Sequence, residues 1–216
     1  NKYFFLRRGQ TENNIADKAA EIGFKAFGIN SSERDLEPLT HLNDKLIVGT
    51  TSGCAKDRNI GKTIFETEKE KIRSFLEKGY NENQHCFLVF SLGGGTGSSI
   101  GPLIAKELKE RNKSFTAVVI HAYNQESGRA FYNEFNALKE IYSLSIPIIS
   151  LDNNKIIEHS PNATKGKYDS FNYSFVKRTK AFLEKIEGSK NGNMDEMEKR
   201  KLLSVPGLIK ITVSKP

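Results

Sequence analysis

Residues 86–99, Cys-Phe-Leu-Val-Phe-Ser-Leu-Gly-Gly-Gly-Thr-Gly-Ser-Ser, form the stretch of this chain that decides its fold. The apolar run 86–90 is short and nearly unbroken, which is typical of a strand buried on both faces. The three glycines at 93–95 allow a backbone to approach a ligand closely. Apolar residues then recur at helical spacing, and Pro102 fits a first helical turn. A strand, a glycine loop and a helix N-terminus in this order predict a phosphate-binding site.

Other interpretations of the glycine loop have to be weighed. A tight turn alone also favours glycine, whether or not a ligand binds there. The Walker pattern is absent, because no Gly-Lys-Ser/Thr follows the loop. The dinucleotide fingerprint is incomplete, because Ser98 stands at the third glycine position and no clear acidic residue ends a second strand at the expected distance.

The composition is that of an ordinary globular chain. Its 216 residues, 37% hydrophobic and 27% charged, are enough for one good-sized domain. The net charge of +7 suggests a nucleic-acid partner, but acidic residues are interleaved with the basic ones throughout. The pattern therefore favours a mixed solvated surface over direct nucleic-acid binding.

Membrane and export signals are not expected either. No apolar run approaches the ~20 residues that a membrane span needs. The short apolar stretch after Lys2 turns at once into Arg7 and Arg8, so no signal peptide is predicted. Cys54 and Cys86 show no metal or redox spacing, which fits a reducing cytoplasm.

Six apolar segments are predicted as strands, and each ends in a polar or glycine-rich loop. Helical patterns lie between most of them, which is typical of an open parallel α/β sheet. Ligands of such sheets bind at the carboxyl ends of the strands, so we expect the loops to converge on one site. The predicted strands are 2–6, 24–29, 46–48, 86–90, 114–123 and 146–151.

The predicted helices include a long charged one at about 62–78 and one with Phe131, Phe135, Leu138 and Ile141 on its apolar face. A further long helix begins at about Ser170. Its apolar stripe is Phe171, Phe175, Phe182 and Ile186.

The C-terminal part of the chain reads as a loop, a short helix and a strand. The strand, 207–213, alternates as if half buried, and its apolar face needs a partner sheet. We therefore expect a second domain to begin there. The expected division is a phosphate-binding α/β domain at 1–187 that includes the long helix from Ser170, a loop and short helix at 188–204, and the first strand of a truncated second domain at 205–216.

The loop 93–98, Gly-Gly-Gly-Thr-Gly-Ser, resembles the signature loop of the tubulin/FtsZ superfamily, which cradles the phosphates of GTP. Residues 9–15, Gly-Gln-Thr-Glu-Asn-Asn-Ile, resemble the first phosphate loop of tubulin, but Glu12 and the preceding Arg7-Arg8 depart from its pattern. The loops after the other strands are similar to further family loops. The resemblance implies GTP-binding roles for Gly9, Gln10, Thr11, Asn14, Asn30, Gly53, Cys54, Ala55, Lys56, Gly93, Gly94, Gly95, Thr96, Gly97, Ser98, Glu126, Arg129, Asn153, Phe171 and Asn172.

The guanine side of the site rests on the same resemblance. The segment containing Asn153 resembles the sixth loop, whose asparagine reads guanine through a buried amide. The helix from Ser170 matches the central helix of the family. Its first aromatic residues, such as Phe171, are candidates to stack on the base, with Asn172 at its edge. The alternative is that these aromatic side chains are core residues.

Asn193, Asp195 and Glu198 stand at the spacing of the catalytic seventh loop of the family, Asn-x-Asp-x-x-Asp/Glu. From chemistry alone, Asp195 and Glu198 share a face of a helix start and are favourable N-terminal acids. The resemblance implies that they orient the attacking water in the nucleotide site of the next subunit. Hydrolysis would then depend on polymerisation.

Within the superfamily, the run 91–104 looks closest to bacteriophage tubulins of the PhuZ type, and next to plasmid-partition TubZ proteins. This resemblance implies a three-layer, Rossmann-like GTPase domain with a central helix. It also implies a head-to-tail homopolymer that uses GTP/GDP and Mg²⁺ and positions DNA in the cytoplasm of a bacterial host, through a DNA-bound adaptor or a phage DNA or capsid cargo. The metal ligands are not assigned, with Gln10, Glu12 and Thr96 as candidates.

Two alternatives stay open. One is a nucleotide-binding polymer or regulator of this family that does not hydrolyse GTP, because Glu12 and Arg7-Arg8 depart from the family loop. The other is a Rossmann-type dinucleotide-binding oxidoreductase. Binding of GTP without binding of NAD would separate the second alternative from the tubulin-like assignment.

Overall fold

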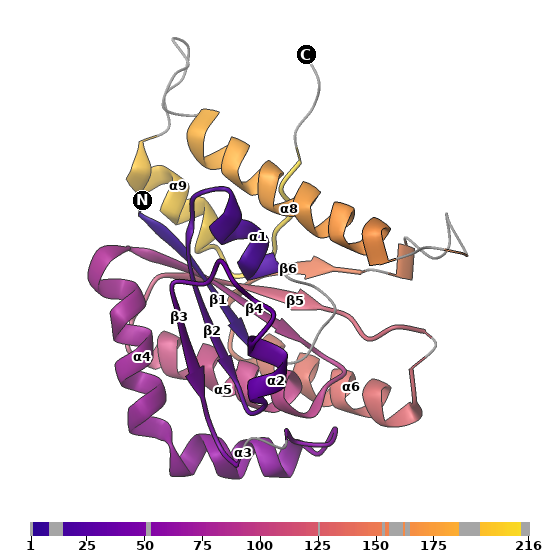
Figure 1. The fold of residues 1–216 in the computed structure, drawn as a ribbon. Helices are drawn as coiled ribbons and strands as arrows, with labels where there is room; N and C mark the ends of the chain where they lie inside the picture. The colour runs from indigo at the N-terminus through magenta and orange to yellow at the C-terminus, as the bar shows by residue number, and fades with distance from the viewer. Residues whose placement is uncertain are drawn as a thin grey trace.

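A computed structural model describes residues 2–8, 15–50, 53–124, 126–152, 154–155, 162, 165–185 and 195–212. Its centre is one parallel sheet of seven strands in the order β3-β2-β1-β4-β5-β6-β7 (Figure 1). The strands are β1 Tyr3–Arg8, β2 Lys25–Asn30, β3 Asp44–Ile47, β4 His85–Ser91, β5 Phe115–Ile120, β6 Pro147–Leu151 and β7 Gly207–Leu208. The predicted open parallel α/β sheet is confirmed.

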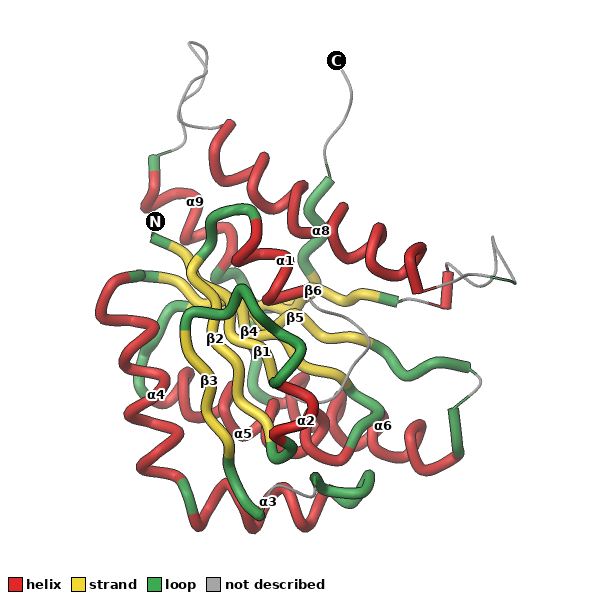
Figure 2. The backbone as a smooth tube through the Cα atoms, viewed as in Figure 1, coloured by secondary structure: helices red, strands yellow, loops and turns green. Residues whose placement is uncertain are grey.

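Helices cover both faces of this sheet, which makes three layers (Figures 1 and 2). One face packs against α3, α4, α5 and α6, and the other against α1, α8 and α9. The helices are α1 Ile15–Glu21, α2 Glu33–Leu36, α3 Arg58–Thr67, α4 Lys69–Glu82, α5 Gly95–Glu110, α6 Gly128–Ser143, α8 Lys165–Lys185 and α9 Glu196–Leu203. Among the described residues, no helix is long and apolar enough to cross a bilayer.

Strands β1 and β4 are buried along their whole length because helices lie on both sides of them. Their side chains alternate between the two cores. Phe4 and Leu6 enter the core under α4 and α5, whereas Tyr3 and Phe5 enter the core under α1 and α8. Strand β1 continues through Arg7 and Arg8, where the sequence predicted that it had already ended.

Helix α5 begins directly at Gly95, so Pro102 lies inside the helix, not in its first turn as predicted. Proline has no N–H, and the carbonyl of Ser98 therefore receives no helical hydrogen bond from position 102. Arg58 donates to this oxygen instead, from Nε at 3.2 Å and from Nη2 at 2.8 Å. The same Nη2 contacts Glu140 at 2.5 Å. Arg58 thus ties α3, α5 and α6 together.

The predicted helix 62–78 is two helices, α3 and α4, with a break at Glu68 (φ −112°, ψ 22°). The carboxylate of Glu68 accepts a hydrogen bond from the backbone N–H of Gly49, and Lys71 donates to it at 2.9 Å. The break therefore connects this helical layer to the loop that follows β3.

The predicted apolar face of α6 is wrong in part. Phe131 and Phe135 are 40% and 67% exposed. The buried face of the helix is Ala130, Asn133, Ala137 and Ile141 instead. Only the last of these belonged to the predicted stripe.

The C-terminal segment also differs from the prediction. Helix α8 begins at Lys165, before the predicted start. Strand β7 is limited to Gly207–Leu208 and pairs in parallel with β6 in the same sheet, so it does not start a partner sheet. Ile211 returns to the core beside α8. The second domain stays a prediction.

Candidate functional site

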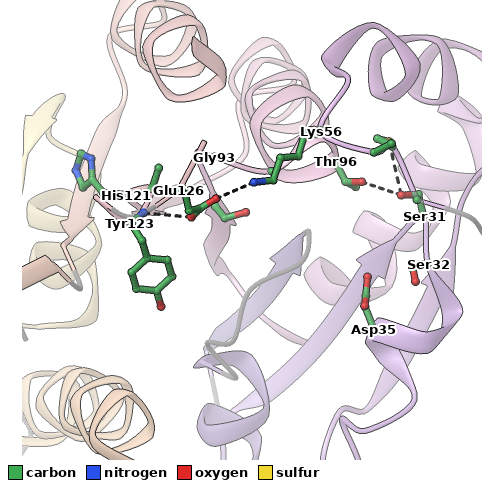
Figure 3. A pocket seen from close by; sticks show the side chains of 16 residues that line it. Ser31, Ser32, Asp35, Lys56, Gly93, Thr96, His121, Tyr123 and Glu126 are labelled. Atoms are coloured by element: carbon green, nitrogen blue, oxygen red, sulfur yellow. Dashed lines mark hydrogen bonds and ion pairs between the residues drawn. The ribbon is translucent and has the colours of Figure 1, made fainter. Parts of the chain in front are cut away.

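A pocket lies at the carboxyl edge of the sheet, where loops following β2, β3, β4 and β5 meet (Figure 3). This is the edge at which parallel sheets bind their ligands. The predicted meeting of loops from different strands is found here. The lining residues are Ser31, Ser32, Asp35, Gly53, Cys54, Ala55, Lys56, Ser91, Gly93, Gly94, Gly95, Thr96, His121, Ala122, Tyr123 and Glu126.

The glycine loop between β4 and α5 leads into a tightly packed helix start, where Gly95 and Gly97 have no room for a side chain. A Cβ at Gly95 would lie 2.9 Å from the backbone of Lys56 and Asp57 and from Cys54 Cβ. A Cβ at Gly97 would lie 2.6 Å from the Ser91 carbonyl oxygen. The close packing brings the N-terminus of α5, with its unpaired N–H groups and positive dipole end, to the pocket. This arrangement suits an anion such as phosphate.

The facing loop, 53–57, adopts a compact left-handed conformation. Gly53, Ala55 and Lys56 have φ values of +75°, +46° and +60°. Such values are uncommon outside glycine and cluster at ligand sites. The loop closes by a 2.6 Å hydrogen bond from Asp57 N–H to the Cys54 carbonyl, and Asp57 then caps α3. Its backbone is therefore held against the glycine loop.

Two sets of polar contacts join the loops around the pocket (Figure 3). The hydroxyls of Ser31 and Thr96 are 2.7 Å apart, and the Ser31 hydroxyl lies 3.7 Å from Cys54 Sγ. On the other side, Lys56 pairs with Glu126 at 3.2 Å, and Glu126 accepts the N–H of Tyr123 at 3.1 Å. These contacts connect loops that are distant in sequence along one side of the pocket.

Asn133 on α6 connects the same loops from the side away from the pocket. This residue was not predicted to belong to the site. Its fully buried amide donates to the Lys56 carbonyl at 3.0 Å and to the Gly93 carbonyl at 3.1 Å. An asparagine among alanines on the buried face of α6 was the signal that could have found it. Arg129 supports the loop from outside the pocket, donating to the Lys56 carbonyl at 3.2 Å.

His121 was also missed, although it lines the pocket directly after β5. Its Nδ1 contacts the carboxylate of Glu134, and its Nε2 contacts the hydroxyl of Ser150 at 2.5 Å. The hydrogen bond with Glu134 raises the pKa of His121 above its ordinary value of 6.5, against the opposite effect of burial. Ser31 and Asp35 are further lining residues that were not among the predicted site residues.

Some predicted residues shape the site without lining it. Asn30 donates to Asp35 at 3.1 Å and accepts the N–H of Ser31 at 2.8 Å, so its amide holds the turn after β2. Gly97 and Ser98 lie in the first turn of α5, behind the lining residues.

On the predicted guanine side, Phe171 and Asn172 belong to α8 and are not among the residues that line the pocket. Phe175 is a core residue, as the alternative interpretation held. Asn154 accepts the N–H of Asn124 at 2.7 Å and donates to the Ala122 carbonyl at 2.9 Å. Gly9, Gln10, Thr11, Asn14, Asn153 and Asn193 lie outside the described residues.

Asp195 and Glu198 form a capping box at the start of α9. Asp195 accepts the N–H of Glu198 at 2.8 Å, and Glu198 accepts the N–H of Asp195 at 2.9 Å. The other end of α9 contacts the beginning of β5, because Thr116 donates to the Leu203 carbonyl at 2.7 Å. Helix α9 therefore packs at the amino edge of the sheet, opposite the edge that carries the pocket.

The pocket fits a nucleotide-bound Mg²⁺ better than a metal site made of protein alone. Among the described residues, no group of three His, Cys, Asp or Glu side chains could hold a metal ion. Asp35 and the hydroxyls of Ser31 and Thr96 supply oxygen atoms at the pocket. Mg²⁺ commonly uses one or two such ligands together with water and phosphate oxygens. Of the candidate metal ligands, Thr96 lines the pocket, whereas Gln10 and Glu12 lie outside the described residues.

A parallel sheet with a glycine loop at the N-terminus of a helix defines a nucleotide-binding α/β protein. Residues 3–161 match the model of the Tubulin/FtsZ family, GTPase domain. The chain belongs to this family, as the glycine loop indicated. The match contains the whole pocket lining.

Relatives with curated descriptions share the same domain. The tubulin-like protein CetZ of Pyrococcus horikoshii is 29% identical over 209 residues, covering 92% of this chain and 57% of the relative. The tubulin-like protein TubZ of Clostridium botulinum C phage is 28% identical over 214 residues, covering 95% and 57%. The chain thus spans little more than half the length of these relatives.

Solved structures agree on the fold. Clostridium botulinum phage c-st TubZ, as a C-terminal tail truncated protein, has a TM-score of 0.79 at 26% identity and covers 96% of this chain and 67% of that one. CetZ2 from Haloferax volcanii, a GTPγS-bound protofilament, has a TM-score of 0.82 at 21% identity, covering 96% and 64%. A PhuZ201 filament has a TM-score of 0.69 at 19% identity, covering 96% and 65%. The last two likenesses show the fold alone.

Proposed function

We propose that this chain is the nucleotide-binding part of a filament-forming, tubulin-like GTPase that binds GTP with Mg²⁺. The observation that carries the proposal is the packing of Gly95 against loop 53–57 at the N-terminus of α5. Two backbone segments there face one pocket that suits a chain of phosphates. Membership of the Tubulin/FtsZ family, GTPase domain, supports this choice of nucleotide.

In this proposal, backbone N–H groups of the glycine loop and of loop 53–57 bind the phosphates. Ser31, Asp35 and Thr96 line the same part of the pocket and would hold Mg²⁺ through oxygen atoms or water. When bound, the ion would supply positive charge that stabilises the phosphate oxygens. Glu126 and Arg129 are assigned to the ribose side, and Asn153, Phe171 and Asn172 to guanine.

We further propose that Asn193, Asp195 and Glu198 act on the nucleotide of a neighbouring subunit. The capping box lies on α9, which packs at the sheet edge opposite the pocket. Carboxylates at that edge are suited to a neighbour stacked head to tail, and not to the pocket of their own chain. Their role would be to orient and polarise the attacking water.

The proposed cellular role is the positioning of DNA by such a filament in the cytoplasm of a bacterial host. Its support is the likeness to the TubZ protein of Clostridium botulinum C phage. The proposed partners are further copies of the chain and a DNA-bound adaptor or a phage DNA or capsid cargo. The bacterial host rests on the TubZ likeness alone, because CetZ of Pyrococcus horikoshii is similar to this chain to the same degree.

A second candidate is a polymer or regulator of this family that binds GTP without turning it over. The capping box favours it, because both Asp195 and Glu198 already accept backbone N–H groups. Membership of the tubulin/FtsZ family leaves no support for the dinucleotide-binding oxidoreductase.

Steady-state GTP turnover by the full-length protein, measured against protein concentration, separates the two candidates. The proposed GTPase shows an onset above a threshold concentration, and Asp195→Ala abolishes turnover while GTP binding persists. Tight GTP binding without turnover at concentrations that form filaments would support the second candidate. Absence of GTP binding would overturn both.

A further inference from the structure

Arg8 occupies a position that the pattern of β1 assigns to a core side chain. It is the last residue of the strand and is 1% exposed. Phe4 and Leu6 precede it on the same face and belong to the core under α4 and α5. A guanidinium group therefore enters the apolar layer between the sheet and these helices.

This buried charge has no close partner in the described part of the chain. None of Nε, Nη1 and Nη2 of Arg8 has a hydrogen-bond partner there, and no carboxylate forms an ion pair with it. Burial lowers the pKa of Arg8 to about 9, with the electrostatic effects of Cys54 and Glu68 acting in the opposite direction. The carboxylate of Glu68 is already engaged by Gly49 and Lys71. A buried cation without a partner is strongly unfavourable.

The strand register places Arg8 at the carboxyl edge of the sheet, which is the edge that carries the pocket. Arg8 pairs with Ile29 on β2 and with Phe90 on β4. Two residues beyond Ile29, Ser31 reaches the hydroxyl of Thr96 and the sulfur of Cys54, all at the pocket. The end of β1 that carries Arg8 therefore lies between β2 and β4, the two strands whose following residues include Ser31 and the glycine loop of the pocket.

We propose that Arg8 is the buried counter-ion of the phosphate chain: its charge stabilises a polyphosphate bound at the N-terminus of α5, and it lowers the stability of the domain when no anion is bound. The reason is that a charge in the protein interior is screened little by solvent or salt. An anion bound in the neighbouring pocket therefore interacts with it strongly. For GTP as the ligand, this inference rests on the proposed function. The ligand class that it requires is a polyphosphate.

Arg7 provides a matched comparison. It is the preceding residue, it is also buried, and it points to the opposite face of the strand. Burial lowers its pKa to about 10, but the carboxylates of Asp35 and Asp17 act in the opposite direction, and Arg7 donates to the Asp35 carbonyl at 3.5 Å. Arg7 therefore has two carboxylates nearby and a carbonyl acceptor, whereas the guanidinium of Arg8 has no hydrogen-bond acceptor among the described residues.

The test is Arg8→Met in the full-length protein, with two readouts that move in opposite directions. Without ligand, the thermal unfolding midpoint rises, because the uncompensated charge is gone. Affinity for GTP falls about tenfold or more, as for the loss of one weakly screened charge interaction. The loss decreases from GTP through GDP to GMP and is absent for guanosine. Arg7→Met, the control, lowers the midpoint without ligand.

Inorganic tripolyphosphate separates failure of this inference from failure of the proposed function. If the native protein binds no GTP, the proposed function fails. Weaker tripolyphosphate binding by Arg8→Met than by the native protein would still support the counter-ion role of Arg8. Equal binding by the two proteins, or no binding by either of them, would overturn it.

A purely structural arginine gives a different result. Arg8→Met would then lower the midpoint without ligand and would weaken guanosine and GTP equally, which overturns the inference. Should Arg8→Met fail to fold, Arg8→Lys decides, because it keeps the charge. It must retain the preference for GTP over guanosine to within about threefold, a margin of about 0.7 kcal/mol, and loss of that preference contradicts the counter-ion role.

Discussion

At the scale of single residues, the pocket depends on side chains that hold backbone in place more than on side chains that face the ligand. Asn133 and Ser31 each join two loops, and Asn30 holds the turn after β2. Phosphate recognition by backbone N–H groups requires this, because the donors are only as well placed as the loops that carry them.

Asn133→Leu should weaken nucleotide binding more than its distance from the ligand suggests. The substitution leaves the buried Gly93 carbonyl without the donor from Asn133, at a cost of about 1–3 kcal/mol, and removes one of the two side-chain donors of the Lys56 carbonyl. Loops 53–57 and 93–95 then lose their common anchor. Equilibrium unfolding and GTP titration should both show the loss. Asn136→Leu on the same helix, whose amide only contacts its own helix backbone, is the control and should change GTP affinity little.

His121→Gln should alter stability in a pH-dependent way. The partner Glu134 raises the pKa of His121 in the folded state above 6.5, so the pair stabilises the fold fully below about pH 6.5. This contribution is lost as pH rises through the raised pKa. The difference in unfolding midpoint between native and variant protein, measured without nucleotide, should therefore be largest in acid and shrink toward alkaline pH. A difference that grows with pH would refute the assignment.

At the scale of elements, helix α5 carries both the proposed phosphate site at its N-terminus and a proline that frees one of its carbonyls. Arg58 from α3 takes that carbonyl of Ser98 and also pairs with Glu140 on α6. Pro102 leaves the Ser98 carbonyl free, and Arg58 uses this carbonyl and Glu140 to connect the three helices behind the pocket.

A double-mutant cycle tests whether Arg58 compensates for the hydrogen bond that Pro102 removes from the Ser98 carbonyl. Arg58→Met alone should cost about 2–3 kcal/mol of unfolding free energy, because it removes the buried arginine of a partly exposed ion pair and leaves the buried Ser98 carbonyl without its side-chain donor. In a Pro102→Ala background, a backbone N–H can supply that donor, so the cost should fall by about 1 kcal/mol. If the losses of unfolding free energy from Arg58→Met and Pro102→Ala add exactly in the double variant, Arg58 and Pro102 do not act together.

The sequence predicts an element well when both of its faces are buried. It predicts the buried face poorly when a close neighbour admits only small side chains. Strands β1, β4 and β5 were recognisable because both of their faces are apolar. On α6 the large apolar side chains were expected inside, yet the helix lies so close to the glycine loop that a Cβ at Gly93 would meet Ala130 at 3.3 Å. Only small side chains and the amide of Asn133 fit there.

The same distinction holds for the site. Glycines and loop positions next to strand ends were found from their local pattern, and Gly93 to Thr96, Cys54 to Lys56 and Glu126 do line the pocket. His121 and Asn133 were missed because their roles depend on partners in other elements. A single sequence contains no signal for such pairings beyond a polar residue on a buried face.

At the scale of the whole molecule, the pocket lies at the carboxyl edge of the sheet, and α9 packs at the amino edge. We propose that the acids at the start of α9 complete the pocket of a neighbouring copy, so GTP turnover is expected to require head-to-tail assembly. The claim concerns the full-length protein, since this chain spans 57% of its CetZ and TubZ relatives.

Mixing two inactive variants of the full-length protein tests the divided site most directly. Asp195→Ala keeps an intact pocket, whereas Gly95→Val places side-chain atoms where even a Cβ meets loop 53–57 at 2.9 Å and should abolish GTP binding. Each variant alone is expected to be inactive, with folding verified by its unfolding transition. GTP turnover in the mixture should reappear, because the acids of Gly95→Val reach the intact pocket of Asp195→Ala. A mixture of folded variants that associate but stay inactive would contradict the account.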